Sequence, residues 1–149
     1  MKKRVDLPEK KYEGYIFDLD GTLVDSMPLH YRAWREALAR AGAPDHVFRA
    51  DEFYSCGGKS ANDVVRFLNE RYGMHMDAAS TAADKRRIYL EMLEKEGMQP
   101  IREVVEFVHS LGDAPKAIAT GSAMPGASRT LAAAGLSGLF DVILTPDEV

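Results

Sequence analysis

The hydrophobic and polar positions of this chain alternate between two kinds of segment. Three short apolar runs, at about 14–19, 116–120 and 140–144, are typical of β-strands, and the first carries apolar residues on both faces, as a fully buried strand does. The remaining segments repeat apolar residues every three or four positions, which predicts amphipathic helices. We expect these helices at about 28–41, 51–54, 60–72, 77–96, 100–111 and 125–134.

Polar residues at the helix ends support these boundaries. Ser60 followed by Asp63 predicts a capping box at the start of one helix. Asp77 or Ser80 is expected to cap the next helix, and Ser26 or Asp25 to lie near the cap of the first.

The order of the elements indicates an α/β fold with a doubly wound, Rossmann-like parallel sheet. The first strand is followed by a long helical stretch, and strand–helix units resume only afterwards. We therefore expect a discontinuous core domain of residues 1–27 and 99–149, with an α-helical cap domain of residues 28–98 inserted after the first strand. Such a cap can close over a site at the strand ends and exclude water.

Two carboxylates directly follow the first strand. Alternation along a strand directs Asp18 and Asp20 to the same side, and Gly21 permits a tight turn after them. Two acids held this close repel each other unless they share a proton or bind a cation, and hard oxygen ligands favour magnesium. A carboxylate at such a site can attack phosphorus while the second acid protonates the leaving oxygen. The alternative is a strand that ends in solvated acids at an ordinary Asp-Gly turn.

A second polar element follows the second strand. Thr120, Gly121 and Ser122 stand at a strand end that lies about 4.8 Å from its neighbour in a parallel sheet. The Thr120 hydroxyl and the amides of Gly121 and Ser122 can donate to phosphoryl oxygens, aided by the start of the following helix. Thr-Gly-Ser alone is a weak signal, because most copies of it form plain turns.

The string from Asp18 to Ser26 resembles the first motif of the haloacid dehalogenase superfamily of phosphohydrolases. Residues 28–34 resemble its β-phosphoglucomutase-like branch, which includes sugar-phosphate phosphatases such as fructose-1-phosphate phosphatase, and the resemblance extends from Tyr12 to Val149. It implies that Asp18 is the nucleophile and that Asp20 is the general acid/base. It also implies that both residues hold magnesium, Asp20 through its backbone carbonyl. Thr120-Gly121-Ser122 resembles the family's second, phosphate-binding motif.

The resemblance also indicates two candidate substrate contacts in the cap. His30 is expected at the junction of cap and core, although a surface helical histidine is the alternative. Lys59 lies in a Gly-rich turn similar to the family's substrate-specificity loop, where it would meet the substrate's phosphate or hydroxyls. A solvated lysine beside a turn explains the same pattern.

The family pattern continues with a lysine in a third motif and one or two acids in a fourth. Asp141, Asp147 and Glu148 stand in the wrong context for these roles. We therefore expect a truncated or partial form of a longer enzyme that lacks the C-terminal part of the core. The first strand would then form an exposed sheet edge, through which the chain is expected to self-associate.

The leading functional hypothesis is a magnesium-dependent phosphatase that acts on a small phosphorylated sugar or related metabolite through an aspartyl-phosphate. A phosphosugar mutase and a non-catalytic binding fragment are the alternatives. A dehalogenase is disfavoured, because those members of the superfamily lack an acid at the position of Asp20.

Composition bears on the binding partners and the cellular location of the protein, and not on its chemistry. A net charge of −4 argues against a nucleic-acid partner. The lone Cys56 excludes an intramolecular disulfide and fits a reducing, cytoplasmic location. No apolar window approaches the roughly 20 residues that span a bilayer, and the basic residues 2–4 are followed by Pro8 and charged residues rather than by a signal peptide's apolar run.

Overall fold

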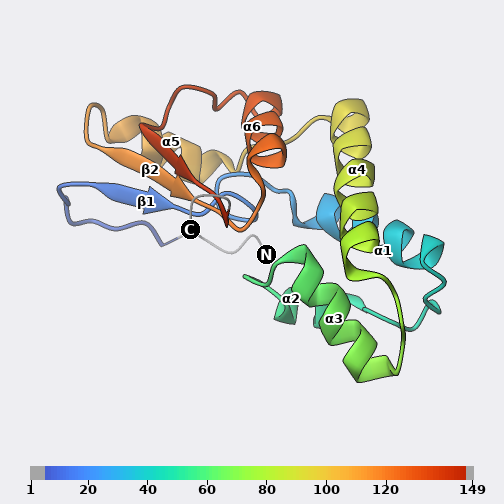
Figure 1. The fold of residues 1–149 in the computed structure, drawn as a ribbon. Helices are drawn as coiled ribbons and strands as arrows, with labels where there is room; N and C mark the ends of the chain where they lie inside the picture. The colour runs from blue at the N-terminus through green and yellow to red at the C-terminus, as the bar shows by residue number, and fades with distance from the viewer. Residues whose placement is uncertain (1–5, 147–149) are drawn as a thin grey trace. The chain divides into compact units, whose positions relative to one another are not determined.

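The computed structural model describes residues 6–146 as three short strands and six helices, in an order that the sequence pattern predicts (Figure 1). The elements are β1 (Tyr15–Phe17), α1 (Met27–Arg40), α2 (Ala50–Ser55), α3 (Ala61–Tyr72), α4 (Ala78–Glu96), α5 (Arg102–Ser110), β2 (Lys116–Ala119), α6 (Met124–Ala133) and β3 (Val142–Leu144).

The three described strands form one parallel sheet in the order β1-β2-β3. Ile16 lies opposite Ala117, which in turn lies opposite Val142, and Phe17 lies in a row with Ile118 and Ile143. The α/β fold class predicted from the sequence is confirmed. The carboxyl ends of the strands, where the candidate acids stand, therefore share one edge of the sheet.

The helices that directly precede β2 and β3, α5 and α6, lie on the same face of the sheet. Phe107 of α5 packs edge-on against Tyr15 and Phe17, with ring centroids 5.8 and 6.3 Å apart. Leu131 of α6 borders the same small cavity as Ile143 of β3. Ile143 shares its row with Phe17, so α5 and α6 cover the same side. This follows from right-handed crossovers that move in one direction along the sheet.

The opposite face of the sheet is open to solvent among the described residues. Ile16 is 75% exposed, Val142 is 49% exposed and Leu144 is 43% exposed. Our prediction that the first strand is buried on both faces is therefore wrong. Phe17 is buried under α5, whereas Ile16 points to the uncovered face and β1 forms an edge of the described sheet.

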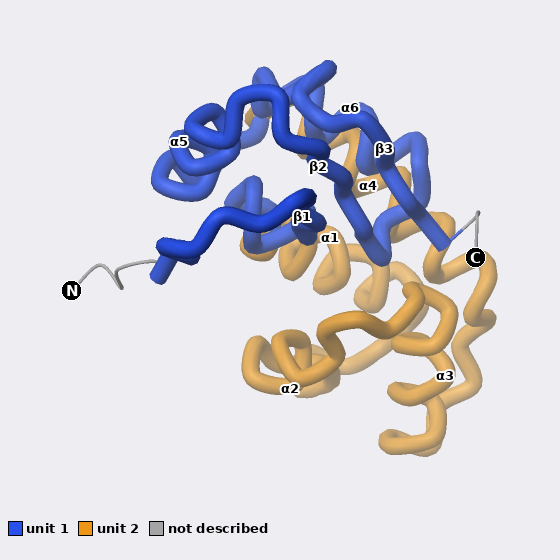
Figure 2. Tube along the Cα trace, turned by 90° about the vertical axis from the view of Figure 1, so that its left-hand side faces the viewer, with its two compact units in different colours: residues 1–26, 98–149 blue, residues 27–97 orange. Residues whose placement is uncertain are grey.

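The chain divides into two compact units, each described here by itself (Figure 2). The sheet unit comprises residues 1–26 and 98–149, and the helical unit comprises residues 27–97. The helical unit has its own apolar core beneath α1, α2 and α3, built from Trp34, Leu38, Val47, Phe48, Phe53, Cys56, Val64, Val65, Leu68 and Met76.

The helix caps predicted within this unit are confirmed. The Ser60 hydroxyl accepts a hydrogen bond from the amide of Asp63 at 3.2 Å, and the Asp77 carboxylate accepts one from the amide of Ser80 at 2.7 Å. These side chains satisfy amides that a helix start leaves without partners, so local sequence chemistry fixes where α3 and α4 begin.

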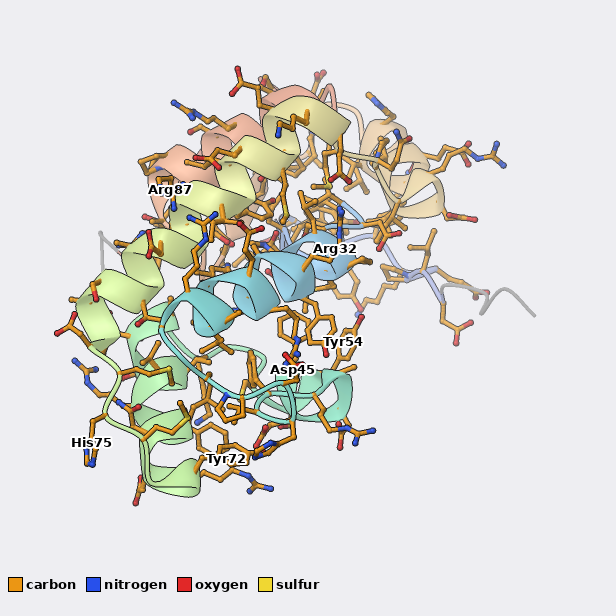
Figure 3. All side chains as sticks on the ribbon, turned by 90° about the vertical axis from the view of Figure 1, so that its right-hand side faces the viewer. Arg32, Asp45, Tyr54, Tyr72, His75 and Arg87 are labelled. Atoms are coloured by element: carbon orange, nitrogen blue, oxygen red, sulfur yellow. The ribbon has the colours of Figure 1, made fainter. Side chains whose placement is uncertain are left out.

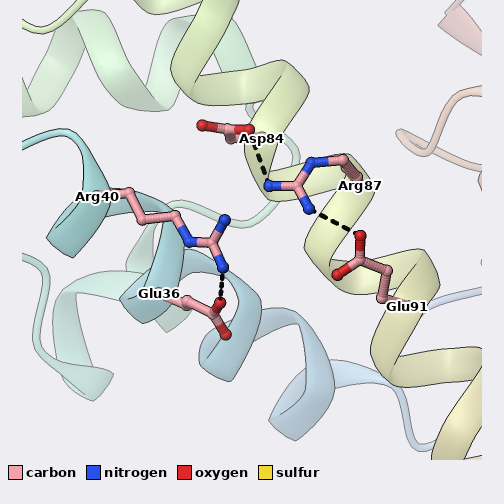
Figure 4. A network of polar contacts seen from close by, with 5 residues as sticks. All are labelled: Glu36, Arg40, Asp84, Arg87 and Glu91. Atoms are coloured by element: carbon pink, nitrogen blue, oxygen red, sulfur yellow. Dashed lines mark hydrogen bonds and ion pairs between the residues drawn. The ribbon is translucent and has the colours of Figure 1, made fainter.

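Exposed ion pairs lie on the surfaces of α1 and α4. Arg87 bridges Asp84 and Glu91 along α4, while Arg40 pairs with Glu36 along α1 (Figure 4). Such exposed pairs within one helix contribute little to folding, because water screens them. Elsewhere on this unit, Tyr54 is 57% exposed and lies near the end of α2 (Figure 3).

The two chain segments that lead to and from the helical unit, residues 23–25 and 99–101, pair with each other inside the sheet unit. The amide of Asp25 donates to the carbonyl of Gln99 at 2.9 Å, and the amide of Ile101 donates to the carbonyl of Leu23 at 2.8 Å. These bonds flank an antiparallel bridge between Val24 and Pro100. The chain therefore leaves the sheet unit and returns to it at one place. No helix within residues 6–146 is long and apolar enough to cross a membrane.

Candidate active site

A compact loop carries the acid pair at the carboxyl end of β1. Gly21 has a φ of 75°, a conformation that disfavours a side chain, and its amide donates to the carbonyl of Val24 at 2.8 Å. The amide of Leu23 returns to the carbonyl of Leu19 at 3.0 Å, and both leucines are fully buried. The buried leucines therefore anchor the loop, and Asp18 and Asp20 flank Leu19 on the less buried side.

Asp18 stands at the end of β1 and is an exposed residue. The amide of Leu19 donates to its Oδ1 at 2.7 Å. Desolvation by the surrounding protein raises the pKa of Asp18, the Leu19 hydrogen bond opposes that change, and the charge of Asp20 raises the pKa further. A bound cation would reverse this balance, because it stabilises the charged carboxylate.

Two hydroxyl groups hold the carboxylate of Asp20. Ser26 donates to Oδ1 at 2.6 Å, and Ser122 donates to Oδ2 at 2.7 Å. Ser26 precedes α1 and is fully buried, while Ser122 follows β2, so two parts of the sheet unit fix one side chain. The position of Ser26 in the sequence predicts only a place near a helix cap. The structure gives its hydroxyl the different role of orienting Asp20.

The second strand end brings Thr120 beside this arrangement. Its amide donates to the carbonyl of Leu144 at 3.0 Å, and its Oγ1 accepts a hydrogen bond from the amide of Ser122 at 3.1 Å. Thr120, Gly121 and Ser122 lead into the start of α6, whose first turn contains no acidic residue. A helix start of this kind favours an anion. The structure therefore brings Asp20 and Ser122 into direct contact, with Thr120 hydrogen-bonded to Ser122.

His30 belongs to the helical unit, where it forms a cluster that the sequence did not reveal. Its ring stacks on Tyr89 of α4, with centroids 4.1 Å apart, and its Nδ1 lies 2.8 Å from the Lys85 ammonium. Lys85 also lies over the rings of Trp34 and Tyr89, at 5.6 and 5.4 Å. Because an ammonium can only donate, Nδ1 of His30 accepts and Nε2 carries the proton.

Lys59 lies in the exposed Gly-rich turn before α3. Its ammonium lies 5.8 Å from the centroid of the Phe67 ring, a cation–π distance. The amide of Lys59 donates to the carbonyl of Cys56 at 3.1 Å, which closes the turn. The turn is therefore ordered from within the helical unit, and a substrate contact by Lys59 stays a prediction.

The donors at the end of β1 match the chemistry of magnesium in kind but are few in number. Asp18 and Asp20 supply hard oxygen ligands. The pKa of Asp18 is raised because its charged form is disfavoured, and a bound cation would stabilise that charged form. Within residues 6–146, no three His, Cys, Asp or Glu side chains lie close enough to hold a metal together. Asp141 lies before β3 and accepts from the Lys116 amide, while Asp147 and Glu148 lie outside the described residues.

A family model described as haloacid dehalogenase-like hydrolase matches residues 15–149. The chain belongs to this family. The haloacid dehalogenase-like family includes phosphohydrolases, and several curated relatives of this chain are named as phosphatases. The chain is 30% identical over 94% of its length to fructose-1-phosphate phosphatase YqaB of Escherichia coli, and spans 72% of that protein. It is 32% identical over 92% of its length to hexitol phosphatase A of Escherichia coli, and spans 61% of it.

Solved structures of other proteins share the fold. A hydrolase from Pseudomonas syringae matches 91% of the chain with a TM-score of 0.78 at 26% identity. CbbY from Rhodobacter sphaeroides, solved in complex with phosphate, matches 92% of the chain with a TM-score of 0.75 at 22% identity. The chain spans 62% and 64% of these two proteins, so both are longer than it.

Proposed function

We propose that this chain carries the nucleophile and the general acid/base of a phosphatase that acts on a small phosphorylated sugar. The observation that supports this most directly is Asp20, whose carboxylate is held by Ser26 and Ser122 beside the exposed Asp18. Two carboxylates with separate environments suit two separate roles. The relatives named as phosphatases of fructose 1-phosphate and of hexitol phosphates support the substrate class.

In the proposed first step, an Oδ atom of Asp18 attacks the phosphorus atom of a phosphate monoester. The bond between phosphorus and the sugar oxygen breaks, and Asp20, a carboxylate in the free protein that enters this step in its protonated form, gives its proton to that oxygen. The products of this step are the free sugar hydroxyl and an aspartyl-phosphate on Asp18.

In the second step, Asp20, now a carboxylate, accepts a proton from a water molecule whose oxygen attacks the same phosphorus. The bond between phosphorus and Asp18 breaks, inorganic phosphate leaves, and both acids return to their starting states. The hydroxyls of Ser26 and Ser122 keep Asp20 in one orientation during both transfers. Thr120 and the amides that follow β2 would bind the equatorial phosphoryl oxygens.

Magnesium fits this proposal as a ligand of the Asp18 carboxylate and of the Asp20 backbone carbonyl. It would supply charge neutralisation for the phosphoryl oxygens when bound. His30 and Lys59 are the proposed substrate contacts of the helical unit.

The decisive experiment measures phosphate release by the 149-residue protein from fructose 1-phosphate and from hexitol phosphates, with magnesium or with a chelator. Asp18→Asn is expected to abolish release, because an amide is a poor nucleophile. Asp20→Asn is expected to slow release by roughly 10²–10⁴-fold on alkyl phosphates, and by less on aryl phosphates, whose leaving groups need less protonation.

Retained phosphate release by Asp18→Asn would rule out the nucleophile. Equal loss on alkyl and aryl phosphates in Asp20→Asn would rule out the acid. If glucose phosphates are interconverted between isomers without net release of phosphate, the protein is a mutase and the proposed phosphatase activity is wrong.

A further inference from the structure

A polar cavity lies in the sheet unit, at the place where α5 ends and where β2 and β3 begin. Its volume is about 330 Å³, near the lower end of the roughly 300–1,000 Å³ that ligand pockets occupy. Its lining combines charged side chains with glycine backbone and a small apolar part, and includes Val108, His109, Asp113, Lys116, Leu139 and Asp141. We call it the amino-edge cavity, because it lies beside the amino ends of two strands.

The amino-edge cavity is separate from the candidate active site. Lys116 is the first residue of β2, and Thr120 directly follows the last residue of that strand. The length of β2, roughly 13 Å at 3.3 Å per residue, therefore lies between the cavity and the strand end that carries Thr120. The proposed phosphatase mechanism uses none of the residues that line the cavity, so their arrangement needs an explanation of its own.

Two charged groups of the cavity are held in place by the start of β2. The Lys116 ammonium donates to the carbonyl oxygens of Gly112 and Ala114, and because an ammonium has three donors, one N–H is left for a ligand. Asp141 accepts a hydrogen bond from the Lys116 amide through Oδ2 at 2.9 Å, which leaves Oδ1 as an acceptor. A donor and an acceptor are thus fixed before any ligand arrives, which lowers the entropic cost of binding.

Two further polar side chains reach the cavity from the end of α5. Asp113 and His109 are both exposed, and among residues 6–146 neither side chain has a hydrogen-bonding or ion-pair partner. A carboxylate accepts hydrogen bonds, while a neutral imidazole donates through one ring nitrogen and accepts through the other. The cavity therefore offers donors and acceptors side by side.

The charges of the lining argue for a ligand that carries no net charge. Lys116 is a cation, whereas Asp113 and Asp141 are anions, so a simple anion and a simple cation would each meet a group of like charge. A hydroxyl group both donates and accepts, which matches the mixed set of partners. Val108 and Leu139 add apolar surface on which C–H groups can pack.

We propose that the amino-edge cavity binds a neutral polyhydroxylated molecule, a free sugar or a sugar alcohol, at a site separate from Asp18. Several hydroxyl groups on a short carbon chain would use the Lys116 N–H, the two carboxylates and the His109 ring together. The proposal rests on the cavity alone and does not depend on the phosphatase activity.

The test titrates the 149-residue protein with sorbitol or with fructose and follows the backbone amide signals by NMR. The amides of Asp113, Lys116 and Asp141 are expected to shift in a saturable way. Half-saturation is expected at about 1–10 mM, because the ligand is small and makes few hydrogen bonds. Asp18→Asn is expected to give the same half-saturation, so failure of the proposed phosphatase would leave this result unchanged.

Two variants remove groups that hold the ligand and no other described residue. His109→Ala and Asp113→Ala are each expected to raise the half-saturating concentration, by about tenfold for the charged Asp113. The matched control is His75→Ala, which removes an exposed imidazole of the helical unit and is expected to bind as the parent does. Circular dichroism melts establish that every variant is folded.

Absence of saturable shifts at the three amides up to about 100 mM of either compound would overturn the proposal. Tighter binding of inorganic phosphate or of putrescine at the same amides would also overturn it, because the cavity would then select an ion. Unchanged binding by both His109→Ala and Asp113→Ala, or equal weakening by His75→Ala, would show that the sugar does not bind in the amino-edge cavity.

Discussion

The hydrogen bond from Ser26 to Asp20 links the stability of the sheet unit to its candidate catalytic acid. The bond is 2.6 Å long, and Ser26 is fully buried. Hydrogen bonds to charged groups contribute about 1.5–3 kcal/mol. We therefore expect Ser26→Ala to lower the free energy of unfolding by about 2 kcal/mol, which corresponds to about 4–8 °C in Tm for a chain of this size.

The assay is urea denaturation at neutral pH, with the charge dependence isolated by a double-mutant cycle. In an Asp20→Asn background the acceptor is a neutral amide oxygen, whose hydrogen bond contributes only about 0.5–1.5 kcal/mol. The loss caused by Ser26→Ala should therefore shrink by about 1 kcal/mol in that background.

The matched control is Ser110→Ala. The Ser110 hydroxyl donates to the carbonyl of Phe107 at 2.6 Å, but the bond is exposed and its acceptor is neutral. Its removal should change the free energy of unfolding by no more than about 0.5 kcal/mol. If Ser26→Ala costs no more than this control, or costs the same with and without the charge on Asp20, then Ser26 does not stabilise the carboxylate.

Three further predictions follow from individual residues. The pKa of Asp18 is raised in the folded state, so the protein loses stability as pH rises from the usual pKa of a carboxyl group through the raised pKa. Urea denaturation in a chelating buffer should therefore show that Asp18→Asn is more stable than the parent at pH 7, and the difference should vanish below about pH 4. Lys85→Met should remove the donor to Nδ1 of His30, so nitrogen chemical shifts should show the proton on Nε2 in the parent and a mixture of tautomers in the variant. Gly97→Ala should destabilise the protein by about 1–3 kcal/mol in the same denaturation assay, because φ is 72° and ψ is −167° there while a Cβ meets no atom within 4 Å, so backbone strain alone is responsible.

Features decided by neighbouring residues could be predicted from the sequence. The caps at Ser60 and Asp77 depend on a side chain and an amide three positions away, so the pattern of polar residues is sufficient to place them. The strand that precedes the acid pair and the helices that follow it were also predicted, because apolar periodicity differs between the two kinds of element.

Features decided by distant residues were missed. The contact between Ser122 and Asp20 joins residues 102 positions apart, and that between Lys85 and His30 joins residues 55 apart. Both require the packing of separate elements, on which local patterns carry no information. The exposure of Ile16 shows a related limit: an apolar residue in a strand indicates that the position can be covered, but not which element covers it.

The ribbon formed by Val24 and Pro100 has an evolutionary consequence. The polypeptide leaves the sheet unit and re-enters it through neighbouring strands, so the whole helical unit is an insertion at a single point. Helical modules of different length and sequence can occupy that point, provided that their two ends lie side by side, and the hydrogen bonds that hold Asp20 would be left unchanged. Selection can therefore alter the helical unit separately from the sheet unit that holds Asp18 and Asp20.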